Sequence, residues 1–307
     1  MGKYSIKDLE RLSGIKAHTI RIWEQRYNII TPERTDTNIR TYCDDDLRKI
    51  LNISLLNKHG IKISHIAEMT DSEIYEQVLS IGDTDTDFSN QVNALTIAMV
   101  EMDEERFEKI ISTNTLRLGF EKTMILILYP FLQRIGVMWL TGAINPAQEH
   151  FISNLIRQKL IVAIDGQSIS LNNDSPKFLL YCPEGELHEM PLLFCNYILR
   201  SRKFRVVYLG ISLPFNNLKS VVEIHKPDYI FSILTTQPAN IETQEYINKL
   251  STSFPKTDIL LSGQELGHQE YLYPENVIHL SNIDSVLNYL EHIQPAQILQ
   301  NILKQKK

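Results

Sequence analysis

A glutamate and a histidine stand two residues apart in the stretch Cys-Pro-Glu-Gly-Glu-Leu-His-Glu-Met-Pro, residues 182–191. A neutral imidazole is the commonest protein ligand of transition metals, and a carboxylate that accepts its other ring N–H fixes the tautomer. Glu186 and His188 have the types for such a pair, but a zinc site needs about four ligands and no second His or Cys is close in sequence. Two interpretations stay open: a histidine satisfied within its loop, or a single axial ligand to a metal held by a macrocycle.

The residues after Lys177 predict the sheet that must position this pair. Short apolar runs alternate there with amphipathic stretches, which is typical of parallel strands buried on both faces and joined by helices. Ligands of such sheets bind outside the carboxyl ends of the strands, and Glu186 and His188 follow the first run directly. The predicted strands are Phe178–Cys182, Phe204–Leu209, Tyr229–Leu234, Asp258–Leu261 and Val277–Leu280.

The segment before the sheet predicts a helical bundle. Apolar residues recur at helical spacing from residue 88 onward, and residues 88–165 contain only two prolines. We expect about four helices, including one from about Gly119 to Leu140 and one from Asn145 to Asp165. The acidic stretch Asp83–Asp87 contains no apolar residue, and we interpret it as a linker or an exposed turn.

The N-terminal segment has the opposite charge to the rest of the chain. Residues 1–70 carry six Lys and six Arg against five Asp and four Glu, a net charge of +3, whereas the whole chain of 307 residues carries −6. Ser5 can cap a short helix that stops at Ser13-Gly14, and a second helix is expected from Ala17 to Tyr27. Its outward residues suit base edges and phosphates, although a solvated charged surface is the alternative. They are Lys16, His18, Thr19, Arg21, Gln25 and Arg26.

A polar turn between two short extended pieces, Pro32–Tyr42, predicts a β-hairpin wing that carries two arginines. The acidic run Asp44-Asp45-Asp46 is expected to cap the helix that follows rather than to bind a metal. Trp23 is expected in the core.

The order of these residues closely resembles the MerR family of transcription regulators. The resemblance covers about residues 3–72, from Thr19-Ile20-Arg21-Ile22-Trp23-Glu24 through the wing to Gly60–Ile66. It implies a winged helix-turn-helix that binds double-stranded promoter DNA as a dimer and twists the spacer between promoter elements. By that match, Thr19, Arg21 and Arg26 belong to the recognition helix. Arg34, Arg40 and Tyr42 belong to the wing, where they touch phosphates.

The C-terminal segment looks like a cobalamin-binding domain. Glu186-Leu187-His188, Tyr208-Leu209-Gly210 and Pro214 carry this resemblance. It implies that His188 displaces the cofactor's own lower base and becomes the axial cobalt ligand. By the same match, Ser232 and Leu234 line the buried nucleotide tail, and Ser262-Gly263 stands where the family usually has two glycines.

The bundle resembles the cap of CarH/LitR-like light-sensing regulators. Trp139, followed after nine residues by Glu149-His150, has the spacing of the residues that close over the upper axial face and its adenosyl group. Taken singly, Trp139 reads as bundle core and Glu149-His150 as an exposed helix surface.

Two positions depart from the pattern of these families. Pro191 stands where the family has Gly, and it is bulky enough to crowd the nucleotide tail. Leu140 follows Trp139 where some light-sensing relatives have a histidine that captures cobalt after photolysis, and leucine cannot do so.

Together these observations predict a multidomain α and α/β protein. Its parts are a winged helix-turn-helix head (1–75), a four-helix bundle cap (88–168), a Rossmann-like parallel five-stranded cobalamin-binding sheet (175–293) and a C-terminal tail (294–307). The expected protein is a regulator controlled by adenosylcobalamin, or else methylcobalamin, and it is not an enzyme. We expect it to form dimers or tetramers and to meet RNA polymerase at the promoter.

Two alternatives to this function stay open. One is a cobalamin-independent regulator whose degenerate sheet domain serves dimerisation or antagonist binding, and the other is a corrinoid carrier protein. The three scattered cysteines and the absence of a long apolar run predict a cytoplasmic protein without a membrane segment.

Overall fold

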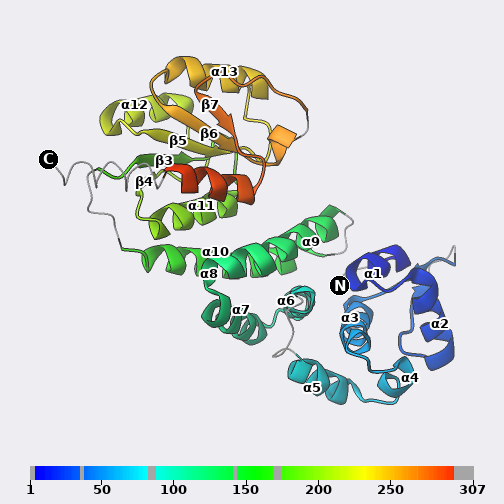
Figure 1. Cartoon of the computed structure of the whole chain (residues 1–307). Coiled ribbons are helices and arrows are strands. Elements are labelled where there is room, and N and C mark those ends of the chain that lie inside the picture. The colour runs from blue at the N-terminus through cyan, green and yellow to red at the C-terminus, as the bar shows by residue number, and fades with distance from the viewer. Residues whose placement is uncertain are drawn as a thin grey trace. The chain divides into compact units, whose positions relative to one another are not determined.

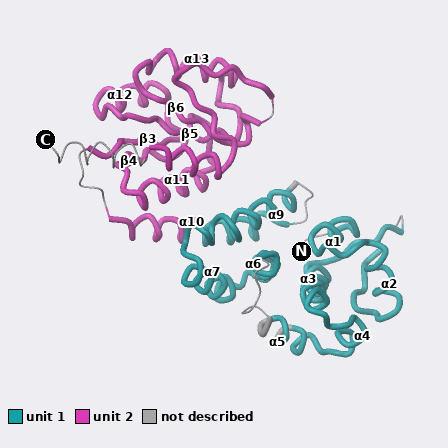
Figure 2. The backbone as a smooth tube through the Cα atoms, viewed as in Figure 1, with its two compact units in different colours: residues 1–156 teal, residues 157–307 magenta. Residues whose placement is uncertain are grey.

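The computed structural model describes residues 4–34, 38–81, 88–140, 144–168, 174–267 and 269–293. The chain divides into two compact units, residues 1–156 and 157–307, which Figure 2 shows in different colours. Helix α10, Pro146–Asp165, runs across the division and contributes residues to both units. The predicted linker 83–87 and the tail 294–307 lie outside the described residues, so the boundaries of the three predicted parts stay predictions.

The head begins with the two expected helices. Helix α1, Ile6–Ser13, starts at the Ser5 cap and ends at Gly14, whose left-handed backbone (φ 74°) favours glycine. Helix α2, Ala17–Tyr27, follows at once. The predicted wing is the antiparallel pair β1, Glu33–Arg34, and β2, Arg40–Thr41. Helices α3, Asp44–Lys58, α4, Ile63–Ile66, and α5, Asp71–Ile81, complete the head.

The acidic run before α3 caps this helix as expected. The carboxylate of Asp46 accepts a hydrogen bond from the backbone N–H of Cys43 at 2.9 Å. The same run places three carboxylates in the first turn, where they interact favourably with the helix dipole.

The bundle has the predicted helices. They are α6, Ser89–Glu101; α7, Glu104–Leu118; a continuous helix from α8, Phe120–Thr123, to α9, Tyr129–Leu140; and α10. The joint between α8 and α9 is a π-helical turn, Met124–Leu128, which the apolar spacing did not predict. A π turn takes an extra residue into the helix and so changes which side chains face the core beyond it.

All five strands of the second unit are parallel, in the order β4-β3-β5-β6-β7. They are β3, Lys177–Tyr181; β4, Arg205–Tyr208; β5, Tyr229–Ile233; β6, Asp258–Ser262; and β7, Val277–His279. Each predicted strand is present within one residue of its expected ends. The strand order reverses next to β3, so the loop after β3 lies at the point where such sheets bind ligands.

Helices cover both faces of the sheet, as Figure 1 shows. Helices α12, Phe215–His225, and α13, Thr243–Ser253, pack on one face, where Leu218, Tyr246 and Ile247 join the apolar core. Helix α11, Glu189–Ser201, and the helix over residues 283–293 cover the other. Burial on both faces explains why the strands read as uninterrupted apolar runs.

Candidate functional site

The carboxylate of Glu186 is buried and fully engaged. Its side chain is 1% exposed. One oxygen, Oε1, accepts from the backbone N–H of His188 at 2.9 Å and lies 2.6 Å from the ring Nδ1. The other, Oε2, accepts from the backbone N–H groups of Thr235 and Thr236 at 2.7 and 2.9 Å, and from the Thr236 hydroxyl at 3.3 Å. Because burial without partners would be costly, these donors are what allow a charged carboxylate here.

The pKa of Glu186 reflects this balance. Burial raises the pKa of the carboxyl, but the hydrogen bonds from His188, Thr236 and Thr235 outweigh it and bring the pKa below its usual value. The group is therefore a carboxylate at neutral pH and accepts the Nδ1 proton of His188.

His188 has one ring nitrogen committed and one available. It is the N-cap residue of α11, and its side chain is 59% exposed. With Nδ1 donating to Glu186, the lone pair lies on Nε2, which is the state of a metal-binding imidazole. Among the described residues, no group of three or more His, Cys, Asp or Glu side chains is placed to hold a metal ion. A ligand role for His188 therefore requires other donors than the described residues.

The residues expected around a nucleotide tail lie at the ends of β5 and β6. Ser232 and Leu234 are fully buried, and the Ser232 hydroxyl has no hydrogen bond of normal geometry within the described part of the chain, although it interacts with the buried Tyr181 hydroxyl. Gly263 has φ 127°, and a Cβ there would lie 2.1 Å from the carbonyl oxygen of Leu234. Only glycine therefore permits the strand ends to approach this closely. Ser262 is buried beside it.

The expected cap residues lie on α9 and α10 in the first unit. Trp139 is 49% exposed, so its ring is not part of the bundle core. Glu149 and His150 form a pair with 2.7 Å between Oε2 and Nδ1, and the Ser153 hydroxyl donates to the other Glu149 oxygen at 2.5 Å. Their side chains are 27% and 72% exposed, respectively. The spacing thus places an exposed indole and an exposed imidazole on the bundle.

The expected DNA-contacting side chains of α2 are accessible. Lys16, His18, Arg21 and Arg26 are exposed, and the hydroxyl of the half-buried Thr19 lies 3.3 Å from His18 Nε2. Ile20 and Trp23 are buried on the opposite side, as predicted. The helix therefore presents a basic, polar face to solvent, which suits a major groove.

The wing residues divide into two groups. Arg34 is exposed and donates to the Asn38 side-chain oxygen at 2.6 Å. Arg40 instead donates to both carboxylate oxygens of Glu24 in α2 at 3.2 Å, and the hydroxyl of Tyr42 lies 3.5 Å from Glu24. Tyr42 is only 1% exposed. Both side chains are turned toward the recognition helix, and their predicted contact with phosphates stays a prediction.

Comparison with known proteins agrees with the description of the head and of the helical bundle. Residues 4–73 match the family described as MerR HTH family regulatory protein, and residues 91–163 match the family described as B12 binding domain. The chain is a MerR-family DNA-binding regulator with a B12-binding domain. Like its relatives, it is a transcription regulator and not an enzyme.

Two curated relatives from Myxococcus xanthus share most of this architecture. The HTH-type transcriptional repressor CarH is 25% identical over 259 residues, covering 82% of this chain and 86% of the relative. The repressor CarA is 27% identical over 227 residues, covering 73% and 74%. Among solved structures, the monomethylamine corrinoid protein of Methanosarcina barkeri is 13% identical with a TM-score of 0.49, covering 63% of this chain and 94% of that one.

The two departures from the family pattern have different outcomes in this regulator. Pro191 is half-buried in the first turn of α11, where a missing N–H costs no helical hydrogen bond. The proline thus fits the helix itself, and its effect on a ligand is a separate question. Leu140 is the last residue of α9, and its side chain lies outside the described residues.

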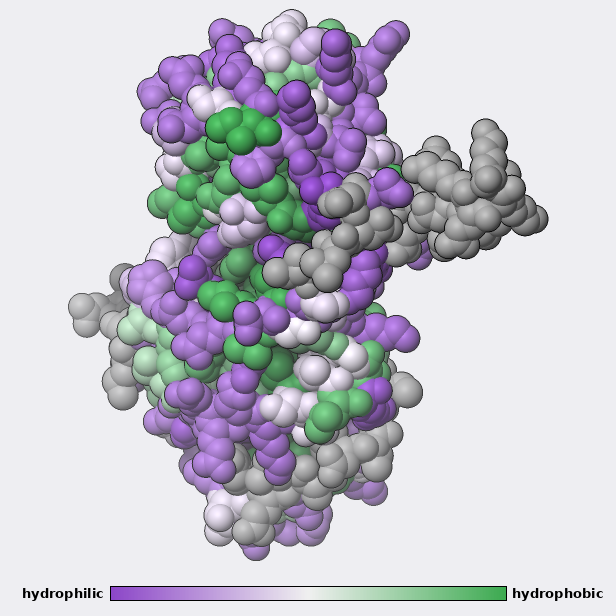
Figure 3. Space-filling view, turned by 90° about the vertical axis from the view of Figure 1, so that its left-hand side faces the viewer, coloured by the Kyte–Doolittle hydropathy of each residue, from purple (hydrophilic) through white to green (hydrophobic). Residues whose placement is uncertain are grey.

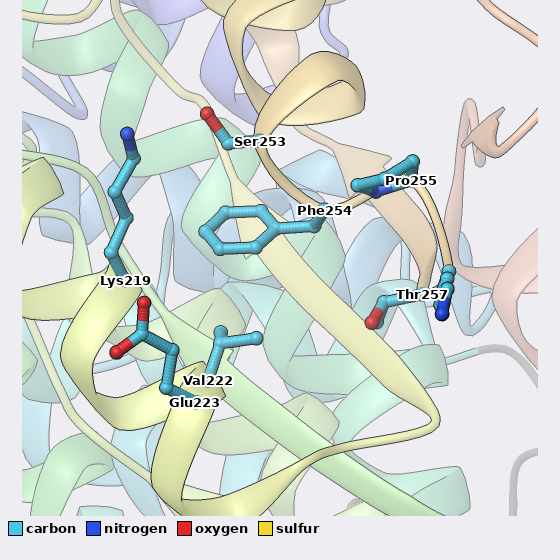
Figure 4. A pocket seen from close by; sticks show the side chains of 8 residues that line it. Lys219, Val222, Glu223, Ser253, Phe254, Pro255 and Thr257 are labelled. Carbon is cyan, nitrogen blue, oxygen red and sulfur yellow. The ribbon is translucent and has the colours of Figure 1, made fainter.

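A pocket of about 340 Å³ lies away from the histidine. It opens between α12 and the turn after α13, with Lys219 and Glu223 on one side and Ser253, Phe254 and Thr257 on the other (Figure 4). Thr257 precedes β6, so this pocket is at the amino edge of the parallel sheet. His188 is at the carboxyl edge, so the pocket is not part of the candidate site around this histidine.

Hydrophobic side chains also reach the surface of the regulator. Figure 3 shows hydrophobic areas among the hydrophilic ones on one face. At the carboxyl edge of the sheet, Leu187 and Ile211 are exposed beside the Glu186–His188 loop. Apolar side chains around a small number of polar protein groups are typical of small-molecule sites. No described helix is long and apolar enough to cross a membrane.

Sequence reasoning missed the partners that hold the site. Thr235 and Thr236 are 49 and 50 residues from Glu186 and were not singled out. The sequence could have indicated them, because they are the first polar residues after the predicted strand Tyr229–Leu234 and therefore lie at the carboxyl edge of the sheet. Glu24 was also missed as a partner of the wing, although it follows Ile20 and Trp23 at the helical spacing of the inner face.

Proposed function

We propose that this regulator is controlled by cobalamin, with adenosylcobalamin as the favoured form and light as a releasing signal. The observation that carries the proposal is the Glu186–His188 pair, in which a buried carboxylate holds Nδ1 and leaves Nε2 available. A preset tautomer lowers the cost of binding a metal, because the ring need not reorganise.

The residues at the carboxyl edge fit this cofactor. His188 would supply the axial nitrogen to cobalt, and the buried Ser232 hydroxyl, which has no hydrogen bond of normal geometry within the described residues, would meet a polar group of the nucleotide tail. The small pair Ser262-Gly263 would leave room for the tail. When bound, adenosylcobalamin supplies a cobalt–carbon bond that light can break.

The cap residues would recognise the upper face of the cofactor. An indole that is half exposed in the bundle offers an apolar surface for the adenosyl group. Glu149 holds His150 through Nδ1 at 2.7 Å, so this histidine too presents Nε2 outward. Loss of the upper group would remove these contacts, and a ligand shifts an equilibrium only through such differential contacts.

The output of this regulator would be promoter binding by the head. Self-association as a dimer or tetramer would bring two heads to adjacent half-sites and would change with the state of the cofactor. RNA polymerase at the promoter is the further proposed partner. The cytoplasm is the compartment consistent with these partners.

An absorption spectrum of the protein with adenosylcobalamin, before and after light, tests the proposal. We expect the loaded protein to be red, to change its assembly on loading, and to lose both properties on illumination. His188→Ala should abolish the histidine-ligated spectrum. His225→Ala, which removes an exposed histidine of the same unit, is the matched control and should behave like the wild type. A spectrum and an assembly that do not respond to cofactor would refute the proposal.

A cobalamin-independent regulator is the second candidate, and Pro191 is the observation that favours it. A ring in the first turn of α11, three residues after His188, narrows the space that the family's glycine leaves open. In that case the sheet would serve dimerisation or bind a protein antagonist. Equilibrium dialysis with several cobalamins separates the two candidates. The corrinoid carrier, the third alternative, is disfavoured by the MerR-family head, and a gel shift with promoter DNA checks this.

A further inference from the structure

A second carboxylate, next to His188 on its other side, is held by other elements than those that hold Glu186. Glu189 is the first residue of α11, and its side chain is 18% exposed. Its Oε2 accepts from Arg157 Nε at 2.7 Å, and its Oε1 accepts from the Tyr208 hydroxyl at 3.2 Å. Tyr208 belongs to the Tyr208-Leu209-Gly210 stretch that carries the cobalamin-domain resemblance, whereas Glu189 and Arg157 lie outside the residues that carry it.

The two carboxylates tie the histidine to opposite neighbours. The order of the sheet is β4-β3-β5, and the turn of residues 183–188 follows the middle strand of these three. Glu186 binds Thr235 and Thr236 after β5, whereas Glu189 binds Tyr208 at the end of β4. The turn is therefore fastened on both sides, and a rotation of His188 about either attachment is opposed by the other.

The charges around Glu189 favour this arrangement. Burial, with the negative charge of Glu189 as the next cause, raises the pKa of Tyr208, so its hydroxyl keeps the proton that it donates. The hydrogen bond to Glu189 raises the pKa of Arg157 in turn. A carboxylate in the first turn of α11 is also favoured by the helix dipole.

Arg157 brings a third element to the turn, because it belongs to α10. The same helix carries Glu149 and Ser153, and the spacing of four residues from Glu149 to Ser153 and again to Arg157 places all three along one side of the helix. The side chain that grips Glu189 and the predicted cap pair are thus parts of one continuous helix.

We propose that Glu189 and Arg157 are positioning residues that fasten the His188 turn to β4 and to the cap helix α10. The role of these two residues rests on the proposed function. They would set the direction of the His188 ring, and they would connect its binding to cobalt with the helix that carries Glu149 and His150. Their role extends that function from the ligand to the residues that aim it.

Hydrogen exchange of the cofactor-free full chain tests the positioning without any ligand. We expect the amides of residues 184–190 to exchange about two- to fivefold faster in Glu189→Gln and in Arg157→Gln, the range that loss of a partly exposed ion pair predicts. Arg157→Lys, which keeps the charge, should restore part of the protection. Glu245→Gln is the matched control, because Glu245 is an exposed first-turn glutamate of α13. Unchanged exchange in both Gln variants would overturn the proposal.

Titration with adenosylcobalamin, followed by its absorption spectrum, tests this role. We expect Glu189→Gln and Arg157→Gln each to raise the Kd and to decrease the histidine-ligated fraction, by about two- to fivefold. The double variant should be no worse than the single ones, because the two residues act as a pair. Additive losses, or spectra like the wild type in all variants, would overturn the proposal. If the wild type binds no cobalamin, the proposed function fails, and the exchange experiment still decides whether Glu189 and Arg157 hold the turn. Should Glu189→Gln not fold, the series at the half-exposed Arg157 gives the same decision.

Discussion

Two histidines of this protein make the same contact with a glutamate in very different surroundings. His188 Nδ1 lies 2.6 Å from Glu186, and His150 Nδ1 lies 2.7 Å from Glu149. Glu186 is 1% exposed and accepts from two further backbone amides and a hydroxyl, whereas Glu149 is 27% exposed and has Ser153 as its other partner. The carboxylate of the first pair is part of the folded core of its unit, whereas the second pair is a feature of a helix surface.

This difference shows how rigidly each histidine–glutamate pair is held before any ligand binds. A buried carboxylate with several donors cannot move without breaking all of them, so His188 is preorganised. A helix-surface pair in water is held by about 1 kcal/mol or less, so Glu149 and His150 remain free to adapt. If His188 is the lower ligand and Glu149 and His150 belong to the cap, as proposed, this contrast would suit a switch in which the cap responds and the ligand stays fixed.

The largest expected effect breaks the first pair. Glu186→Ala should destabilise the sheet unit by about 3–5 kcal/mol, because the amides of Thr235 and Thr236 lose a charged acceptor inside the protein. Glu149→Ala should cost less than about 1 kcal/mol. Urea denaturation followed by circular dichroism measures both. Equal losses for the two variants would show that the contrast between the pairs is not energetic.

A third carboxylate, Glu24, is intermediate in burial and sharpens the comparison. It is 13% exposed and holds Arg40 and Tyr42 of the wing against α2. We expect Glu24→Ala to cost about 1–3 kcal/mol of stability, because Arg40 loses a charged partner. It should also weaken promoter binding, measured by gel shift at fixed salt, although Glu24 itself is an acid. Glu33→Ala, on the exposed side of the wing, is the control; tighter binding in both variants would mean that Glu24 acts only as a negative charge.

Pro191 allows the preorganised turn to be loosened without touching a carboxylate. Pro191→Gly should lower the free energy of unfolding by about 0.5–1 kcal/mol, because glycine gains entropy in the unfolded chain. If the ring crowds the nucleotide tail, the variant binds adenosylcobalamin more tightly despite this loss. Calorimetric titration together with urea denaturation gives both numbers, and weaker binding in the glycine variant would show that the ring aids the site.

His279 of β7, a partly buried histidine that stacks on a tyrosine, gives the smallest expected effect. His279 stacks on Tyr273 at 5.2 Å between ring centroids, and burial lowers the pKa of the imidazole below its usual 6.5. The folded state therefore binds the proton less readily than the unfolded state, and the stabilisation is complete above pH 6.5 and is lost as the pH falls through the folded value. His279→Phe should make stability less dependent on pH in this window. Denaturation at several pH values checks it, and an unchanged slope contradicts it.

Local patterns in the sequence were enough for the elements. Ser5, Gly14 and the acidic run before α3 act on their own neighbours, so the helix ends could be predicted within the head. The five apolar runs became five parallel strands, of which β3, β5 and β6 are almost fully buried and the edge strands β4 and β7 only partly. The position of His188 after the first strand followed from the same alternation.

Contacts between distant segments could not be predicted in this way. Thr235 and Thr236 reach Glu186 because β3 pairs with β5. Tyr208 reaches Glu189 because β3 pairs with β4. The inward orientation of Arg40 and Tyr42 depends on how the wing folds back on α2. Charge and family resemblance both predicted that these wing residues face DNA. Neither gives the orientation of a side chain, so neither could predict that Arg40 and Tyr42 turn toward α2.

The π-helical turn Met124–Leu128 has a consequence for the indole that ends α9. Each residue of an α-helix advances the chain by about 100° around the axis, so deleting one residue of this turn would swing Trp139 by about that angle while leaving its sequence neighbours unchanged. The direction in which Trp139 points from α9 thus depends on the number of residues in the π-helical turn, which lies more than two helical turns upstream. A homologue that lacks the extra residue would carry the same tryptophan on a different side of the bundle, and an alignment of letters would not reveal it.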